Sequence, residues 1–99
     1  MLMMSQIIVG IDFSTSSMTA LRLAVDIANR TGADILMAWI ETKEKDREEA
    51  QQELNKIASD YKPKLNGKNI SYIICQGKVY QAIAKLVKDE NPDLLVIGA

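Results

Sequence analysis

Hydrophobic and polar residues along this chain follow two patterns in turn, one typical of β-strands and one typical of α-helices. Apolar runs at residues 6–12, 34–40, 70–75 and 94–97 have the length and content typical of buried strands. The segments between them carry apolar residues at spacings of three and four, which is typical of helices packed on a core. Strands alternating with helices in this way predict an α/β domain with a largely parallel sheet.

The predicted helices carry recognisable end signals. Ser14 or Ser16 offers a hydroxyl to the first amides of the first helix, and Gly32 ends that helix in the left-handed conformation. The second helix is predicted to begin near residue 43 and to end before Pro63. Its first turns, residues 43–49, are charged and have no apolar anchor, so we expect them to be solvated.

Asp12 is the most informative residue for function, because it follows the first apolar run at a strand-to-helix turn. Open α/β sheets bind ligands at the carboxyl ends of their strands. We expect this carboxylate to be partly desolvated, so that it needs hydrogen-bond donors. Two interpretations stay open: amides of the following turn, near Ser14, donate to it, or the amino group or ring edge of a base does.

Other candidate residues have a structural and a functional interpretation. The hydroxyls of residues 14–17 surround a helix N-terminus, which favours anions, but no glycine follows Asp12 to let a phosphate approach. Trp39 either stacks on an aromatic ligand or fills the core. Cys75, within an apolar strand, is interpreted as an inert core thiol.

Composition limits the function further. The chain has 99 residues, which suits one domain, and its net charge of -1 with no basic stripe argues against nucleic-acid binding. Residues 1–12 lack the parts of a signal peptide, and no apolar run could span a membrane. A single cysteine suits the reducing cytoplasm, and the lack of histidine argues against transition-metal sites and Ser-His-Asp triads.

Two segments, IIVGIDFSTSSMTALRLAVDIANRTGADILMAWI and CQGKVYQAIAKLVKDENPDLLVIGA, resemble the universal stress protein family. The resemblance covers most of the chain. It implies a three-layer, doubly wound parallel sheet of the adenine nucleotide alpha hydrolase-like type, with order 3-2-1-4-5, four helices and dimerisation through the last strand. We expect this chain to form the 3-2-1-4 part as one incomplete domain over residues 1–99, with the fifth strand and the fourth helix absent.

One branch of that family binds ATP through an aspartate after the first strand and a G-x-x-G-x9-G-[S/T] motif after the fourth. The resemblance implies that Asp12 matches the aspartate and Gly98 the first glycine, with Ile97 before it and Ser14 beside the site. Trp39 stands where a smaller aliphatic residue lines the adenine pocket, so it would stack on the base or block it. The expected ligand is ATP, accompanied by Mg²⁺, or another adenine nucleotide.

The resulting hypothesis is a cytoplasmic stress-response regulatory module without enzymatic activity. The alternative is a nucleotide-free dimerisation or scaffold module of the same fold. A flavodoxin-like or receiver domain of order 2-1-3-4-5 is disfavoured, because Gln76-Gly77 stands where a receiver needs an aspartate. We expect the third helix alone to cover one sheet face, leaving an apolar strip and a free strand edge that favour a homodimer or higher oligomer.

Overall fold

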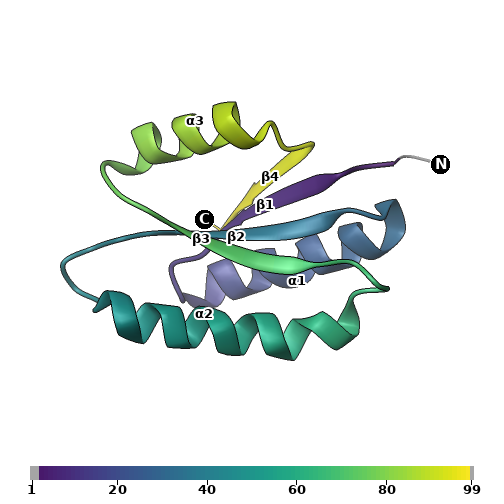
Figure 1. The fold of residues 1–99 in the computed structure, drawn as a ribbon, viewed down its shortest axis with the longest axis horizontal. Coiled ribbons are helices and arrows are strands. Elements are labelled where there is room, and N and C mark those ends of the chain that lie inside the picture. Colours follow the sequence, from purple (N-terminus) through teal and green to yellow (C-terminus); the bar gives the residue numbers. More distant parts are fainter. Residues whose placement is uncertain (1–2, 99) are drawn as a thin grey trace.

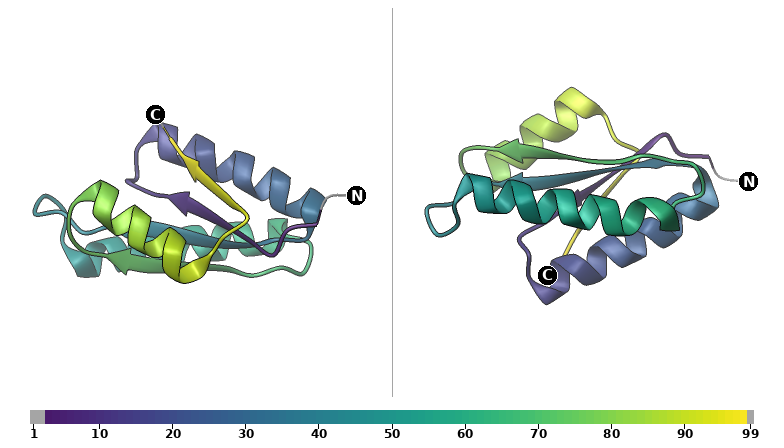
Figure 2. Two further views of the ribbon diagram at one scale, coloured as in Figure 1. Left: turned by 90° about the horizontal axis from the view of Figure 1, so that it is seen from above. Right: turned by 60° about the horizontal axis from the view of Figure 1, so that its bottom comes forward.

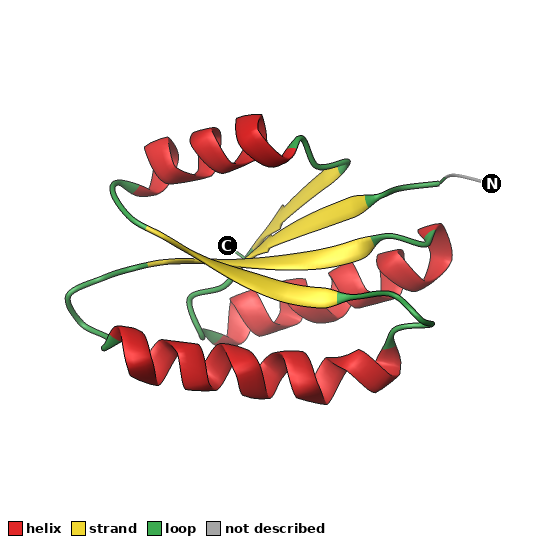
Figure 3. Cartoon of the chain, viewed as in Figure 1, coloured by secondary structure: helices red, strands yellow, loops and turns green. Residues whose placement is uncertain are grey.

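The computed structural model describes residues 3–98. Its elements alternate between strand and helix: β1 (Gln6–Gly10), α1 (Thr15–Thr31), β2 (Asp34–Ile40), α2 (Arg47–Tyr61), a short 3₁₀ helix η1 (Lys62–Lys64), β3 (Ile70–Cys75), α3 (Val79–Glu90) and β4 (Leu94–Ile97). Figure 3 shows this alternation along the chain. The α/β class predicted from the hydrophobic pattern is therefore confirmed.

The four strands form one parallel sheet in the order β3-β2-β1-β4. This is the predicted order, and it differs from the 2-1-3-4-5 order of the flavodoxin-like alternative. At the centre, Gly10 of β1 lies opposite Ala38 of β2 on one side and Ile97 of β4 on the other. The carboxyl ends of these strands therefore share one edge of the sheet.

Helices cover the two faces unequally (Figures 1 and 2). Helices α1 and α2 lie on one face and α3 lies on the other, as right-handed crossovers require. The α1 and α2 face carries the larger core cluster, whose fully buried side chains include Ile7, Leu21 and Leu54. The buried residues of the cluster on the α3 face are Ile8, Leu36, Ala38 and Leu86.

The predicted free strand edge is β4. Within residues 3–98 this strand pairs only with β1, and its residues Leu95 and Val96 are half-buried. Ile97 at its end is 57% exposed. The strand edge is therefore unprotected in the described part of the chain, which is the feature that favours pairing with another strand.

Two predicted boundaries are wrong by a few residues. The first strand ends at Gly10 instead of residue 12, because the chain turns at Phe13, whose φ is 64°. The second helix begins at Arg47 instead of residue 43, with the Asp46 side chain accepting a hydrogen bond from the Glu49 amide as N-cap. Residues 41–46 thus form a loop.

None of the helices in residues 3–98 has the length and apolar character needed to cross a bilayer.

Candidate functional site

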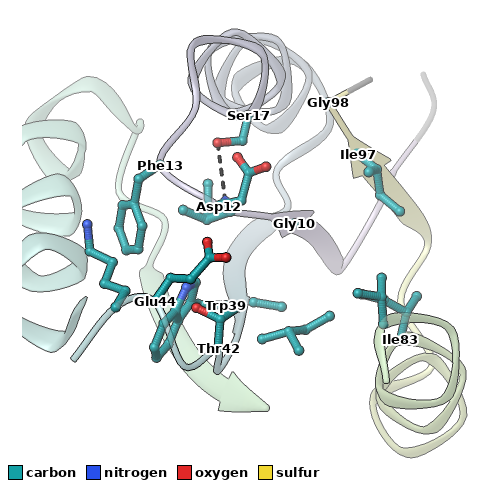
Figure 4. A pocket seen from close by; sticks show the side chains of 15 residues that line it. Gly10, Asp12, Phe13, Ser17, Trp39, Thr42, Glu44, Ile83, Ile97 and Gly98 are labelled. Atoms are coloured by element: carbon teal, nitrogen blue, oxygen red, sulfur yellow. Dashed lines mark hydrogen bonds between the residues drawn. The ribbon is translucent and has the colours of Figure 1, made fainter. Parts of the chain in front are cut away.

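A cavity of about 480 Å³ opens at the carboxyl ends of β1, β2 and β4 (Figure 4). Of the five predicted site residues, Asp12, Trp39, Ile97 and Gly98 line this cavity. Ser14 does not line it, although it contacts Asp12. The remaining lining residues are Gly10, Ile11, Phe13, Ser17, Ala38, Ile40, Thr42, Glu44, Lys45, Val79 and Ile83.

Asp12 is held by the turn that follows it. Its Oδ1 accepts a hydrogen bond from the Ser14 amide at 2.9 Å and a short one from the Ser14 hydroxyl. These two bonds, the hydroxyl first, lower the pKa of the Asp12 carboxyl below its usual value. Desolvation acts in the other direction and raises this pKa, but it is the smaller effect, because β1 ends before Asp12 and the residue is exposed at the cavity edge.

Ser14 links this turn to the first helix. Its hydroxyl accepts a hydrogen bond from the Ser17 amide at 3.1 Å, so Ser14 is the N-cap of α1, as predicted. The Ser17 hydroxyl in turn accepts a bond from the Asp12 amide at 3.3 Å, drawn as the dashed line in Figure 4. The local interpretation of Asp12, as an acceptor that shapes the helix start, is therefore correct.

Two aromatic residues form one wall of the cavity. The Phe13 and Trp39 rings lie 6.2 Å apart between centroids and are tilted by 51°. Trp39 is only 3% exposed and belongs to the larger core cluster, which supports the core-filling interpretation of this residue. Phe13 is half-buried, so it offers the more accessible ring.

The opposite wall comes from the end of β4. The Ile97 side chain lies 3.7 Å from the position that a Cβ on Gly10 would take. At Gly98 an added Cβ would lie 2.5 Å from both the carbonyl carbon and oxygen of Ser16. Glycine at position 98 therefore lets the end of β4 pack directly on the first turn of α1.

The loop between β2 and α2 supplies residues that sequence reasoning missed. Glu44, Lys45 and Thr42 line the cavity. The Lys45 ammonium lies 4.2 Å from the Phe13 ring centroid and 2.7 Å from Glu53 Oε1. The expectation that residues 43–49 are solvated is confirmed except at Lys45, which is half-buried, but residues 43–46 form a loop and not the end of a helix. The helical periodicity of α2 begins only after Asp46, a helix-capping residue type that marked this boundary in the sequence.

A second set of polar contacts ties the start of this loop to β3. The Glu41 carboxylate accepts two hydrogen bonds from the Arg47 guanidinium, at 3.0 and 3.2 Å. It accepts a third, at 2.9 Å, from the side-chain amide of Gln76. These donors, Arg47 first, lower the pKa of the Glu41 carboxyl. The loop thus has fixed ends on both sides of Glu44.

Metal and thiol chemistry find little support in the described chain. Residues 3–98 contain no cluster of three or more Asp, Glu, His or Cys side chains that could hold a metal ion. Burial raises the pKa of the Cys75 thiol, so it stays in the weakly reactive protonated form, as expected of a core cysteine.

Comparisons with known proteins agree with this geometry. The family model described as "Universal stress protein family" matches residues 3–99. A comparison with curated proteins gives no match.

Solved structures share the fold. Protein Rv1636 from Mycobacterium tuberculosis H37Rv is similar over 99% of this chain and 73% of its own, with 27% identity and a TM-score of 0.71. A universal stress protein family protein from Arabidopsis thaliana, crystallised with AMP bound, matches over 96% of this chain and 76% of its own at 20% identity and a TM-score of 0.73. A universal stress protein in complex with cAMP matches over 94% and 75%, at 20% identity and a TM-score of 0.69.

Proposed function

Because this chain belongs to the universal stress protein family, we propose that it is a stress-response regulatory module that binds an adenine nucleotide. The proposed site is the cavity at the carboxyl ends of β1, β2 and β4. The module acts through the ligand it holds and catalyses no reaction of its own.

The observation that carries this proposal is the position of Asp12 and Gly98 on one cavity. They are distant in sequence, and the pairing of β1 with β4 brings their strand ends together. In an open α/β sheet this is the switch point, because β2 and β3 lie on one side of β1 and β4 lies on the other. A carboxylate and a close-packed glycine at such a point suit a ligand with hydrogen-bond donors that lies against backbone.

The chemistry of the walls suits a nucleoside. A flat apolar base fits between the Phe13 ring and the aliphatic side of the cavity, which is formed by Ile83 and Ile97. When ionised, the Asp12 carboxylate accepts hydrogen bonds and donates none, so it matches the exocyclic amine of adenine or a ribose hydroxyl. Ser14 acts indirectly, by holding Asp12. The relatives crystallised with AMP and with cAMP support an adenine ligand.

ATP with Mg²⁺ belongs to the same ligand class. Its base and ribose would contact different residues from its phosphates. Asp12, Trp39, Ile97 and Gly98 surround the space for base and ribose. The β-phosphate and γ-phosphate would extend toward the part of the cavity that Thr42, Glu44 and Lys45 of the β2–α2 loop line. A bound Mg²⁺ would reduce the charge of the triphosphate that the cavity residues meet.

The proposal extends to location and assembly. A lone half-buried cysteine suits a reducing cytoplasm. Within residues 3–98 one edge of β4 is unpaired, and this edge and the exposed Ile97 side chain support self-association as a homodimer or higher oligomer. Neither nucleic acid nor membrane is proposed as a partner.

A nucleotide-free dimerisation or scaffold module is the second candidate. Two observations favour it. Ser14 donates a hydrogen bond to Asp12 within the turn, and Trp39 is buried in the core. Both residues then have structural roles that need no ligand. The unpaired β4 edge would carry the function in this case.

Calorimetric titration of the purified protein separates the two candidates. The nucleotide hypothesis predicts saturable binding of AMP and of ATP with Mg²⁺, and weaker binding of GMP. Guanine places a carbonyl where adenine has its amine, and a carbonyl opposite a carboxylate is repulsive. If no adenine nucleotide gives a binding signal at millimolar concentration, the nucleotide hypothesis is wrong and the scaffold hypothesis is supported.

A further inference from the structure

We infer that Glu44 sets the phosphate preference of this cavity, so that ligands with a single phosphate bind better than those with a triphosphate. The inference rests on the proposed function, since it concerns how the same cavity selects among adenine nucleotides. It assigns a role to a residue of the β2–α2 loop, which lines this cavity together with the ends of β1 and β4.

The placement of Glu44 is the first observation. Its carboxylate points into the cavity toward Asp12, from the other side of the opening (Figure 4). Glu44 takes part in no ion pair within residues 3–98. Its charge therefore acts on whatever enters between the two carboxylates.

The second observation is the state of the nearby cation. Lys45 is the cationic residue among those that line the cavity, and it is already engaged. Its ammonium lies 2.7 Å from Glu53 Oε1 and 4.2 Å from the Phe13 centroid. Asp12 and Glu44 thus give the cavity an excess of negative charge that Lys45 offsets only in part.

This charge distribution discriminates between parts of a nucleotide. Ribose hydroxyls and the adenine amine can donate to either carboxylate. Each additional phosphate brings more negative charge near Glu44, and the repulsion is reduced by water because Glu44 is exposed. Repulsion of this kind, screened by solvent, changes relative affinity by about three- to fivefold between a monophosphate and a triphosphate.

The test compares Glu44→Gln with Glu48→Gln. Glu48 is also exposed and lies four residues further along, on the first turn of α2, but it does not line the cavity. Affinities for AMP and for ATP without Mg²⁺ are measured by calorimetry at low and at high salt, and thermal melts check that both variants fold.

We expect Glu44→Gln to raise the affinity for ATP relative to the affinity for AMP by about three- to fivefold at low salt. The gain should shrink at high salt, and Glu48→Gln should leave the ratio unchanged. If AMP binds the wild-type protein but the ratio is the same in Glu44→Gln, the role of Glu44 is wrong while the proposed function stands. If no adenine nucleotide binds the wild-type protein, both are wrong.

Discussion

An aspartate accepts hydrogen bonds from backbone amides at each end of the sheet, but only one of the two lies beside a cavity. At the carboxyl end, Asp12 follows β1 and accepts hydrogen bonds from Ser14. At the amino end, Asp93 precedes β4 and its Oδ2 accepts from the Ser5 and Gln6 amides, at 2.7 and 3.1 Å. In both cases these bonds lower the pKa of the carboxyl. Only Asp12 lines the cavity.

The difference lies in what the neighbouring backbone leaves open. At the amino end, the Asp93 amide donates to the Gln6 carbonyl and the Asp34 amide to the Ser5 carbonyl, so adjacent strands are tied together. At the carboxyl end, Asp12 bonds within its own turn, and a cavity lies beside it between the ends of β1, β2 and β4. A hydrogen-bonded aspartate with a lowered pKa is therefore insufficient to identify a site; the space beside it is what distinguishes Asp12.

The largest expected effect separates the two aspartates by ligand binding. Asp12→Ala should weaken AMP binding about tenfold or more, because a hydrogen bond to a charged acceptor is lost. Asp93→Ala should leave AMP affinity unchanged, since it lies at the far end of the sheet. Calorimetric titration of both variants measures this, and equal losses in the two would show that the aspartates act through stability alone.

Gly98 tests the close contact between β4 and α1. Gly98→Ala places a Cβ against the backbone of Ser16, and relieving that clash should cost about 1–3 kcal/mol of unfolding free energy or displace the strand end. Gly67→Ala is the control, because nothing lies within 4 Å of its Cβ position.

Gly67 has a φ of 78°, so alanine there carries its own strain of about 1 kcal/mol. Both variants can therefore lose stability, and AMP affinity is the discriminating measurement. It should fall in Gly98→Ala and remain in Gly67→Ala. Unchanged affinity in Gly98→Ala would contradict the role of this contact in the site.

Acid unfolding compares the two ends without a ligand. The pKa of both carboxyls is lowered in the folded protein, so each stabilises the fold above its unfolded pKa of about 3.9. That contribution is lost as the pH falls through the folded pKa. Thermal melts between about pH 6 and pH 2.5 should show less pH dependence in Asp12→Asn and Asp93→Asn than in wild type. A slope identical to wild type in either variant would contradict its hydrogen bonding.

The smallest expected effect concerns two lysines that each lie over an aromatic ring. Lys45 lies over Phe13 at the cavity, and Lys64 lies 4.8 Å from the Tyr61 centroid, away from it. Changing either lysine to Met should lower the free energy of unfolding of the protein by less than about 1 kcal/mol. Only Lys45→Met should alter AMP affinity, by about two- to threefold, because it loosens the wall formed by Phe13. An equal effect of both variants on AMP affinity would contradict the contribution of Lys45 to the cavity wall.

Much of the fold could be predicted from the sequence because its signals are local. Apolar runs located the strands, and Ser14 and Gly32 marked the ends of α1. The family resemblance supplied the strand order, which placed Asp12 and Gly98 on one edge. The hydrogen bond from Ser14 to Asp12 was also among the predicted alternatives, since it joins residues close in sequence.

The loop that closes the cavity could not be predicted in the same way. Lys45 reaches Phe13 and Glu53 through contacts that depend on where α1 and α2 pack, and a charged run carries no periodic signal for this. The same holds for Glu44, which the sequence placed in a solvated helix. The degree to which Asp12 is exposed was not predicted either, because β1 ends two residues before it.

The most direct test of the central claim is a titration of ¹⁵N-labelled protein with AMP, followed by amide chemical shifts. If AMP binds in the cavity, saturable shifts should begin together at Asp12, Ile97 and Gly98, since these residues line it. Ser5, Gln6 and Asp93, at the amino end of the sheet, should not move. Shifts confined to the amino end, or no shifts at saturating AMP, would contradict the central claim.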